Sequence, residues 1–125
     1  MDTVSIIWYF LVMEVRQRDT NFYQTKEGKE PAREWLESLK DKRTRGKVLT
    51  RIRRAETGDF GDWKGIGDGV CEMRIPHGPG FRVYFGIDDE GDLIILLAGG
   101  DKSTQSGDIE KAKSYWQDYK DRRPS

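Results

Sequence analysis

The chain has 125 residues, enough for one domain with a modest hydrophobic core. Its single cysteine, Cys71, excludes an internal disulfide, and one cysteine with one histidine cannot supply a structural zinc site, so we expect no metal and no small-molecule cofactor. The 22 basic and 22 acidic side chains give zero net charge, whereas nucleic-acid binders are commonly basic.

The chain begins with an apolar extension, VSIIWYFLV, from Val4 to Val12. This run is too short to span a bilayer, no basic segment precedes it, and no small-residue cleavage site follows it. We therefore expect that this run is neither a membrane anchor nor a signal peptide. We also expect the protein to be cytoplasmic. The predicted organisation is an extension of unassigned role at 1–12, a domain at 13–121 and a tail at 122–125.

An edge strand and two helices are predicted next. Residues 13–18 alternate in polarity, which is typical of a strand. Pro31 marks a helix start, because a proline at the first helical position loses no hydrogen bond. After a polar turn at 40–45, a second helix should end at Gly58. The expected core faces are Ala32, Trp35, Leu36 and Leu39 in the first helix, and Val48, Leu49, Ile52 and Ala55 in the second.

Three strands and a last helix complete the predicted domain. Glycine and aspartate make 59–69 a predicted loop, and 70–75 and 81–87 alternate as strands around a turn at 76–80. The apolar run 93–97, ended by Gly99 and Gly100, is typical of a central strand covered on both faces.

The last helix, 106–119, should be capped by Ser106 or Asp108 and followed by a frayed end from Lys120. This order of elements predicts an α+β fold: a small, mainly antiparallel sheet with a helical hairpin on one face and a C-terminal helix.

Two arginines should face each other on the predicted hairpin. Matching the apolar faces of its strands places Arg74 opposite Arg82, and Glu72 opposite Tyr84. Opposed like charges repel unless an anion lies between them. That anion is either a protein carboxylate such as Glu72 or the phosphate of a ligand, and the sequence favours neither. Lys102, which follows the central strand, is expected near the same face, unless it is simply a solvated loop lysine.

Basic residues crowd the second predicted helix, between Lys40 and Arg54. Such a run is commonly a solvated face, but it is also a candidate contact for RNA or the ribosome. Within it, the residues we expect to make that contact are Lys42, Arg43, Arg45, Lys47 and Arg51.

Other residue types with catalytic potential are weaker candidates. His77 has no second histidine to accompany it, and Cys71 should point into the core with Met73. Trp35 and Trp116 lie at helical spacing and are expected in the core rather than as platforms for bases.

The segment VCEMRIPHGPGFRVYFGIDDEGDLIILLAGGDKSTQ resembles the three-strand core of the RelE/ParE superfamily, and more narrowly its phage-derived, HigB-like addiction module killer group. The preceding EWLESLKDKRTRGKVLTRIRRAETGDFGDWKGIGDG resembles the helical hairpin and loop of that group. The resemblance runs from about Phe22 to Tyr119, and the ordered combination of MRI, GFRVYF and GGDKSTQ is specific.

This resemblance implies a RelE-like fold and a type II toxin, a metal-independent mRNA endoribonuclease that acts on the ribosome and inhibits translation. Its partners would be the ribosome, mRNA and a cognate helix-turn-helix antitoxin. Arg74, Arg82 and Lys102 match basic positions of the family. The arginines would stabilise the phosphate during attack by the 2′-hydroxyl, and Lys102 would orient the backbone or act as the acid. The general base is not assigned.

The chain departs from the family pattern at two places. Glu72 stands where some ribosome-cutting members carry lysine, and Tyr115 and Tyr119 are the only candidates for the tyrosine that some members use in the last helix. Two alternatives therefore stay open. One is a non-catalytic inhibitor on the same fold, like the gyrase-poisoning ParE-like members, and the other is an inactive relic that only binds an antitoxin.

Overall fold

The computed structural model describes residues 17–90 and 92–124, together with Thr3 and Ile6. Most of the apolar extension at 1–12, and positions 13–16 of the predicted edge strand, lie outside the described residues.

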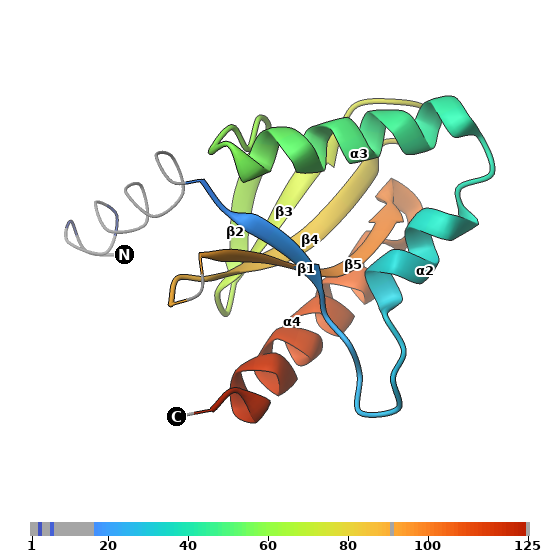
Figure 1. Cartoon of the computed structure of the whole chain (residues 1–125). Helices are drawn as coiled ribbons and strands as arrows, with labels where there is room; N and C mark the ends of the chain where they lie inside the picture. Colours follow the sequence, from blue (N-terminus) through green and yellow to red (C-terminus); the bar gives the residue numbers. More distant parts are fainter. Residues whose placement is uncertain (1–2, 4–5, 7–16, 91, 125) are drawn as a thin grey trace.

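The described residues form a mixed sheet covered by helices on both faces. Its strand order is β1-β5-β4-β3-β2, with β1 parallel to β5 and every other neighbouring pair antiparallel. In Figure 1, α3 lies above the sheet and α4 below it. The α+β class and the C-terminal helix are therefore as predicted. The elements are β1 (Asp19–Phe22), α2 (Pro31–Ser38), α3 (Lys42–Glu56), β2 (Trp63–Gly67), β3 (Val70–Ile75), β4 (Phe81–Asp88), β5 (Leu93–Asp101), the short 3₁₀ helix η1 (Lys102–Thr104) and α4 (Gln105–Arg122).

Each face of the sheet has its own apolar cluster. Because successive strand residues point to opposite faces, β5 contributes to both. Ile94 and Leu96 pack with α2 and α3, while Ile95 and Leu97 pack with Ala112 and Trp116 of α4. The prediction of a central strand covered on both sides is confirmed.

The two N-terminal helices begin near their predicted positions. α2 starts at Pro31, and α3 starts at Lys42, where the Asp41 carboxylate caps the helix by accepting the Arg43 N–H at 3.1 Å. The turn before α3 is therefore shorter than predicted. Leu49 was wrongly placed in the core: its exposed fraction is 37%, and Thr44 is buried on the inner face instead.

The predicted loop at 59–69 is wrong in its second half, because β2 pairs there with β3. Asp68 and Gly69 connect the two strands with φ angles of 57° and 82°. Positive φ at both central residues is what a tight two-residue hairpin turn requires. The glycine-rich sequence hid a strand that the Asp-Gly pair could have revealed.

β5 is longer than predicted, since it continues through Gly99 and Gly100 to Asp101. A Cβ at Gly99 would overlap the Trp35 ring, and one at Gly100 would overlap the Asp108 carboxylate. These glycines therefore let α2 and α4 approach the strand rather than ending it.

Three predicted chain boundaries also differ from the structure. The first strand is Asp19–Phe22, so Gln17 and Arg18 lie outside it. Neither Ser106 nor Asp108 caps α4; the cap precedes η1, where Asp101 accepts the Ser103 N–H at 2.8 Å. The end of α4 is not frayed, because the helix continues to Arg122.

Candidate functional site

The predicted hairpin register is confirmed. Arg74 pairs with Arg82 across β3 and β4, and Glu72 pairs with Tyr84. Arg82 in turn lies opposite Gly100 of β5. Alternation places the side chains of Glu72, Arg74, Arg82 and Tyr84 on the face of the sheet that α4 covers.

A fully buried carboxylate lies between the two arginines. Glu72, with an exposed fraction of 0%, lies 3.5 Å from Nε of Arg74 and 3.7 Å from Nε of Arg82. Gln105, the first residue of α4, donates from Nε2 to the same carboxylate at 2.8 Å. Of the two anions that the sequence left open, the protein carboxylate Glu72 is therefore the one that lies between the arginines. A buried carboxylate is stable only with such partners. The contacts to the arginines are ion pairs and not hydrogen bonds, because Oε1 of Glu72 and both Nε atoms have no hydrogen-bond partner among the described residues.

Both arginines use Nε toward Glu72, which leaves their terminal nitrogens for other contacts. Arg82 donates from Nη1 to the Gly80 carbonyl at 2.8 Å. Within residues 17–90 and 92–124, no acceptor meets Nη2 of Arg82 or the terminal nitrogens of Arg74. The Arg74 side chain is 39% exposed and that of Arg82 is 11% exposed. The pair can therefore receive an anion at its open side while Glu72 holds it from within.

Lys102 lies at the same end of the sheet. It begins η1 directly after Asp101, which pairs with Phe81 beside Arg82. Hydrogen bonds from Ser103 hold the pKa of the Asp101 carboxyl below its usual range, and the positive charge of Arg82 lowers it further. Lys102 is exposed, and no carboxylate of the described residues lies within salt-bridge distance of it.

Tyr84 forms the inner wall of this site. Its side chain is completely buried opposite Glu72. Burial raises the pKa of the Tyr84 hydroxyl, and the negative charge of Glu72 raises it further, so the phenol is neutral near neutral pH.

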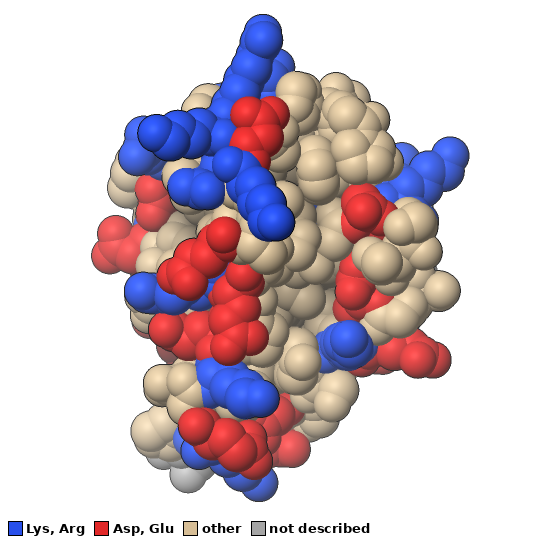
Figure 2. Space-filling view, turned by 90° about the vertical axis from the view of Figure 1, so that its right-hand side faces the viewer, with Lys and Arg blue, Asp and Glu red and all other residues tan. Residues whose placement is uncertain are grey.

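The basic residues of α3 divide into two groups. Lys42, Arg43 and Lys47 are exposed, and Figure 2 shows lysine and arginine side chains gathered over the start of this helix. Arg45 instead donates from Nη2 to the Leu39 carbonyl at 2.7 Å, and Arg51 is also turned inward. Arg45 and Arg51 therefore do not present free guanidinium groups for the RNA contact predicted for them.

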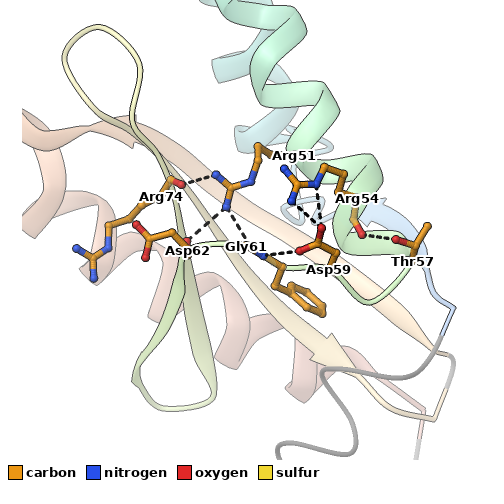
Figure 3. A network of polar contacts seen from close by, with 8 residues as sticks. Arg51, Arg54, Thr57, Asp59, Gly61, Asp62 and Arg74 are labelled. Carbon is orange, nitrogen blue, oxygen red and sulfur yellow. Dashed lines mark hydrogen bonds and ion pairs between the residues drawn. The ribbon is translucent and has the colours of Figure 1, made fainter.

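Arg51 fastens the end of β3 to α3. It donates to the Arg74 carbonyl at 2.6 Å and to the Phe60 carbonyl at 3.0 Å. In Figure 3 the Arg74 guanidinium extends away from Arg51, although their hydrogen bond joins the two residues. Burial lowers the pKa of Arg51, yet a guanidinium remains charged at any physiological pH. Arg51 thus positions the strand that carries Arg74.

Sequence reasoning missed two residues of this neighbourhood. Gln105 reaches Glu72 from the start of α4, and Lys64 of β2 lies opposite Glu72 in the sheet register. Lys64 was missed because β2 was taken for a loop. Gln105 had no signal in the hairpin pattern, since it enters from another element.

The fold and cluster define a small α+β protein with a pair of arginines, open to an anion, at one end of its sheet. The chain is 51% identical over 79 residues to a Haemophilus influenzae protein described only as uncharacterized, and the match covers 63% of this chain and 79% of that relative. The chain belongs to the same family as that protein.

No family model matches the chain, and no solved structure matches it. Over the described residues, no helix is long and apolar enough to cross a membrane. No group of three or more His, Cys, Asp or Glu side chains in that part of the chain could hold a metal ion.

Proposed function

We propose that this chain is the toxin of a type II toxin–antitoxin pair and that it cuts mRNA on the ribosome. The single observation that carries the proposal is the opposed Arg74–Arg82 pair, which Glu72 holds through the two Nε atoms. Nη2 of Arg82 and both terminal nitrogens of Arg74 remain for a phosphate, a group that arginine binds well, whereas Nη1 of Arg82 already donates to the Gly80 carbonyl.

A RelE-like fold is part of the proposal. The quoted motifs of the sequence resemble that family, and the architecture is compatible with it. The helical hairpin of α2 and α3 lies on one face of the sheet and α4 lies on the other. The motif GGDKSTQ spans the end of β5, η1 and the first residue of α4. Its last residue, Gln105, reaches Glu72, and Lys102 lies three residues before Gln105 in the chain.

The proposed chemistry needs no metal. The RNA 2′-hydroxyl loses its proton to solvent as its oxygen attacks the adjacent phosphate. The new P–O bond forms, the bond from phosphorus to the 5′ oxygen breaks, and that oxygen takes up a proton. Arg74 and Arg82 stabilise the extra negative charge on the phosphate in the transition state, and because Glu72 already orients them, little reorganisation is needed. Lys102, which is exposed and follows the end of β5, protonates the leaving oxygen or orients the backbone.

Glu72 also limits the positive charge of the site. One carboxylate offsets one of the two arginines, so Lys102 and the exposed Lys64 supply the rest. In this proposal Glu72 positions the arginines, and the exposed residues of α3, Lys42, Arg43 and Lys47, contact RNA. A cognate helix-turn-helix antitoxin would neutralise the toxin.

The proposal is tested by inducing the chain in a bacterial host without an antitoxin, while growth and the 5′ ends of mRNA are followed together. We expect growth arrest and new cuts inside translated codons. Both should be lost in Lys102→Ala and Arg74→Ala, because both side chains are exposed enough to be removed without unfolding the sheet. Lys26→Ala is the matched control, since Lys26 is an exposed lysine in the turn between β1 and α2.

Two results would replace the nuclease proposal. Growth arrest with intact mRNA would favour a non-catalytic inhibitor such as a gyrase poison. Full growth despite accumulation of folded protein would favour an inactive, antitoxin-binding relic.

A further inference from the structure

A second basic surface lies on the other side of the β3–β4 turn. A groove of about 480 Å³ runs between α3 and this turn, and its lining includes Arg43, Gly46, Lys47, Arg51, Pro76 and His77. Among the described residues, no carboxylate lines it. Ile75, which also lines the groove, directly follows Arg74, and strand alternation turns the two side chains to opposite faces. The groove and the arginine pair therefore flank the same end of the hairpin.

His77 is held in this groove by a chain of hydrogen bonds. The Thr44 hydroxyl lies 2.9 Å from Oδ2 of Asp41 and 3.0 Å from Nε2 of His77. Hydrogen bonds from the Thr44 hydroxyl and the Arg43 N–H hold the pKa of the Asp41 carboxyl below its usual range. Asp41 is therefore ionised and accepts the single Thr44 proton, so Thr44 must accept from Nε2–H of His77. This fixes the ring, and Nδ1 is the nitrogen left for a ligand.

Gly46 keeps the floor of the groove open. It lies inside α3, where glycine is less favourable than alanine by about 1 kcal/mol. Nothing in the fold requires a glycine there, because a Cβ at this position would meet no described atom within 4 Å. A longer side chain would extend into the groove that Gly46 lines.

The spacing of the charges matches a repeating anion. Arg43 and Lys47 are one helical turn apart, which separates them by about 6 Å along the axis. This is comparable with the separation of successive phosphates in a nucleic-acid strand. The groove has the size of a site for a small ligand, which suits one strand rather than the width of a duplex.

We infer that this groove binds the phosphodiester backbone of single-stranded RNA, beside the strand segment that lies at Arg74 and Arg82. The inference rests on the proposed function in that the bound strand is the RNA to be cut. Arg43 and Lys47 contact successive phosphates, Arg51 adds positive charge from below, and His77 supplies a further polar contact.

The test measures binding of a short, labelled, single-stranded RNA to the full chain by fluorescence anisotropy at several salt concentrations, without ribosomes. Each phosphate contact contributes about 0.7 to the slope of log affinity against log salt for a single strand. We expect Lys47→Ala to lower that slope by about 0.7. Arg53→Ala is the matched control, because Arg53 is exposed on α3 but does not line the groove.

A second pair of variants tests the groove without a change of charge. Gly46→Gln should weaken RNA binding by obstructing the groove, whereas Gly46→Ala should bind as the parent does. The inference is wrong if Lys47→Ala and Arg53→Ala give equal salt slopes, or if the two Gly46 variants bind RNA with equal affinity. The groove would then be a candidate site for an acidic protein segment. The binding assay does not measure cleavage, so the two proposals can fail separately. If the chain binds RNA in the groove but cuts no mRNA in the host, the nuclease proposal is wrong and the groove inference stands.

Discussion

Glu72→Gln is the substitution that best tests how the arginines are held. The change keeps the shape of the side chain and removes its charge, so Arg74 and Arg82 lose their common counter-ion. Gln105 can still donate to the remaining amide oxygen. The expected effect is therefore electrostatic rather than a loss of packing.

The magnitude follows from the exposure of each arginine. Breaking a buried ion pair typically costs about 3–5 kcal/mol, whereas an exposed pair is worth about 0–1 kcal/mol. Arg82 is 11% exposed and belongs to the first case, while Arg74 is 39% exposed and can turn to solvent. The distances of 3.5 and 3.7 Å are longer than good hydrogen bonds. We therefore expect the free energy of unfolding to fall by about 3 kcal/mol, the lower end of the buried case.

Urea unfolding followed by circular dichroism measures this loss as a shift in the transition midpoint. Glu110→Gln is the control, because Glu110 is an exposed glutamate of α4 without an ion pair among the described residues. In the double variant Glu72→Gln with Arg82→Met, much of the lost stability should return, since the buried charge has gone. A loss below about 1 kcal/mol in Glu72→Gln would refute the idea that Glu72 fixes the arginines.

Two further predictions concern packing and alkaline pH. Gly99→Ala should destabilise the fold by about 1–3 kcal/mol, because the new Cβ overlaps the indole ring of Trp35. Gly46→Ala should instead stabilise it slightly, because alanine favours a helix and nothing lies near its Cβ. Equal urea unfolding midpoints for the two variants would contradict this contrast. Burial, then hydrogen bonds to carboxylates, raise the pKa of Tyr23 and Tyr119 to about 12. Because the folded state holds these protons more tightly, the stability they contribute is present below pH 10.0 and is lost as the pH rises toward about 12. Tyrosinate absorbance should therefore rise together with unfolding, and complete titration of the tyrosines in a folded chain near pH 10.0 would count against it.

The hairpin with its arginines was predictable because its signal is local. Alternation along β3 and β4 fixes the parity of the register, and the apolar faces can meet in only one sense. With Ile75 set opposite Phe81 in that parity, Arg74 falls opposite Arg82, as the structure has it. The continuous apolar run of β5 likewise indicated burial on both faces.

What the sequence could not predict depends on contacts between distant elements. Whether an arginine of α3 faces solvent or a carbonyl is decided by the chain beneath it, and for Arg51 that chain is the segment near Phe60 and Arg74. Leu49 fits the helical stripe, but Thr44 takes the inner position, where it contacts His77. β2 was missed because three of its five residues are exposed and two are glycines, so no alternation of polar and apolar residues marks it.

The parallel pairing of β1 with β5 has a consequence for the newly made chain. Asp19 pairs with Leu93, so the first strand cannot complete the sheet until most of the protein has been synthesised. Pairing across such a long stretch of sequence slows folding. A chain interrupted before β5 lacks the strand next to β4, and it also lacks Lys102 and Gln105, which follow that strand. No fragment that ends before β5 can therefore assemble the complete cluster around Glu72.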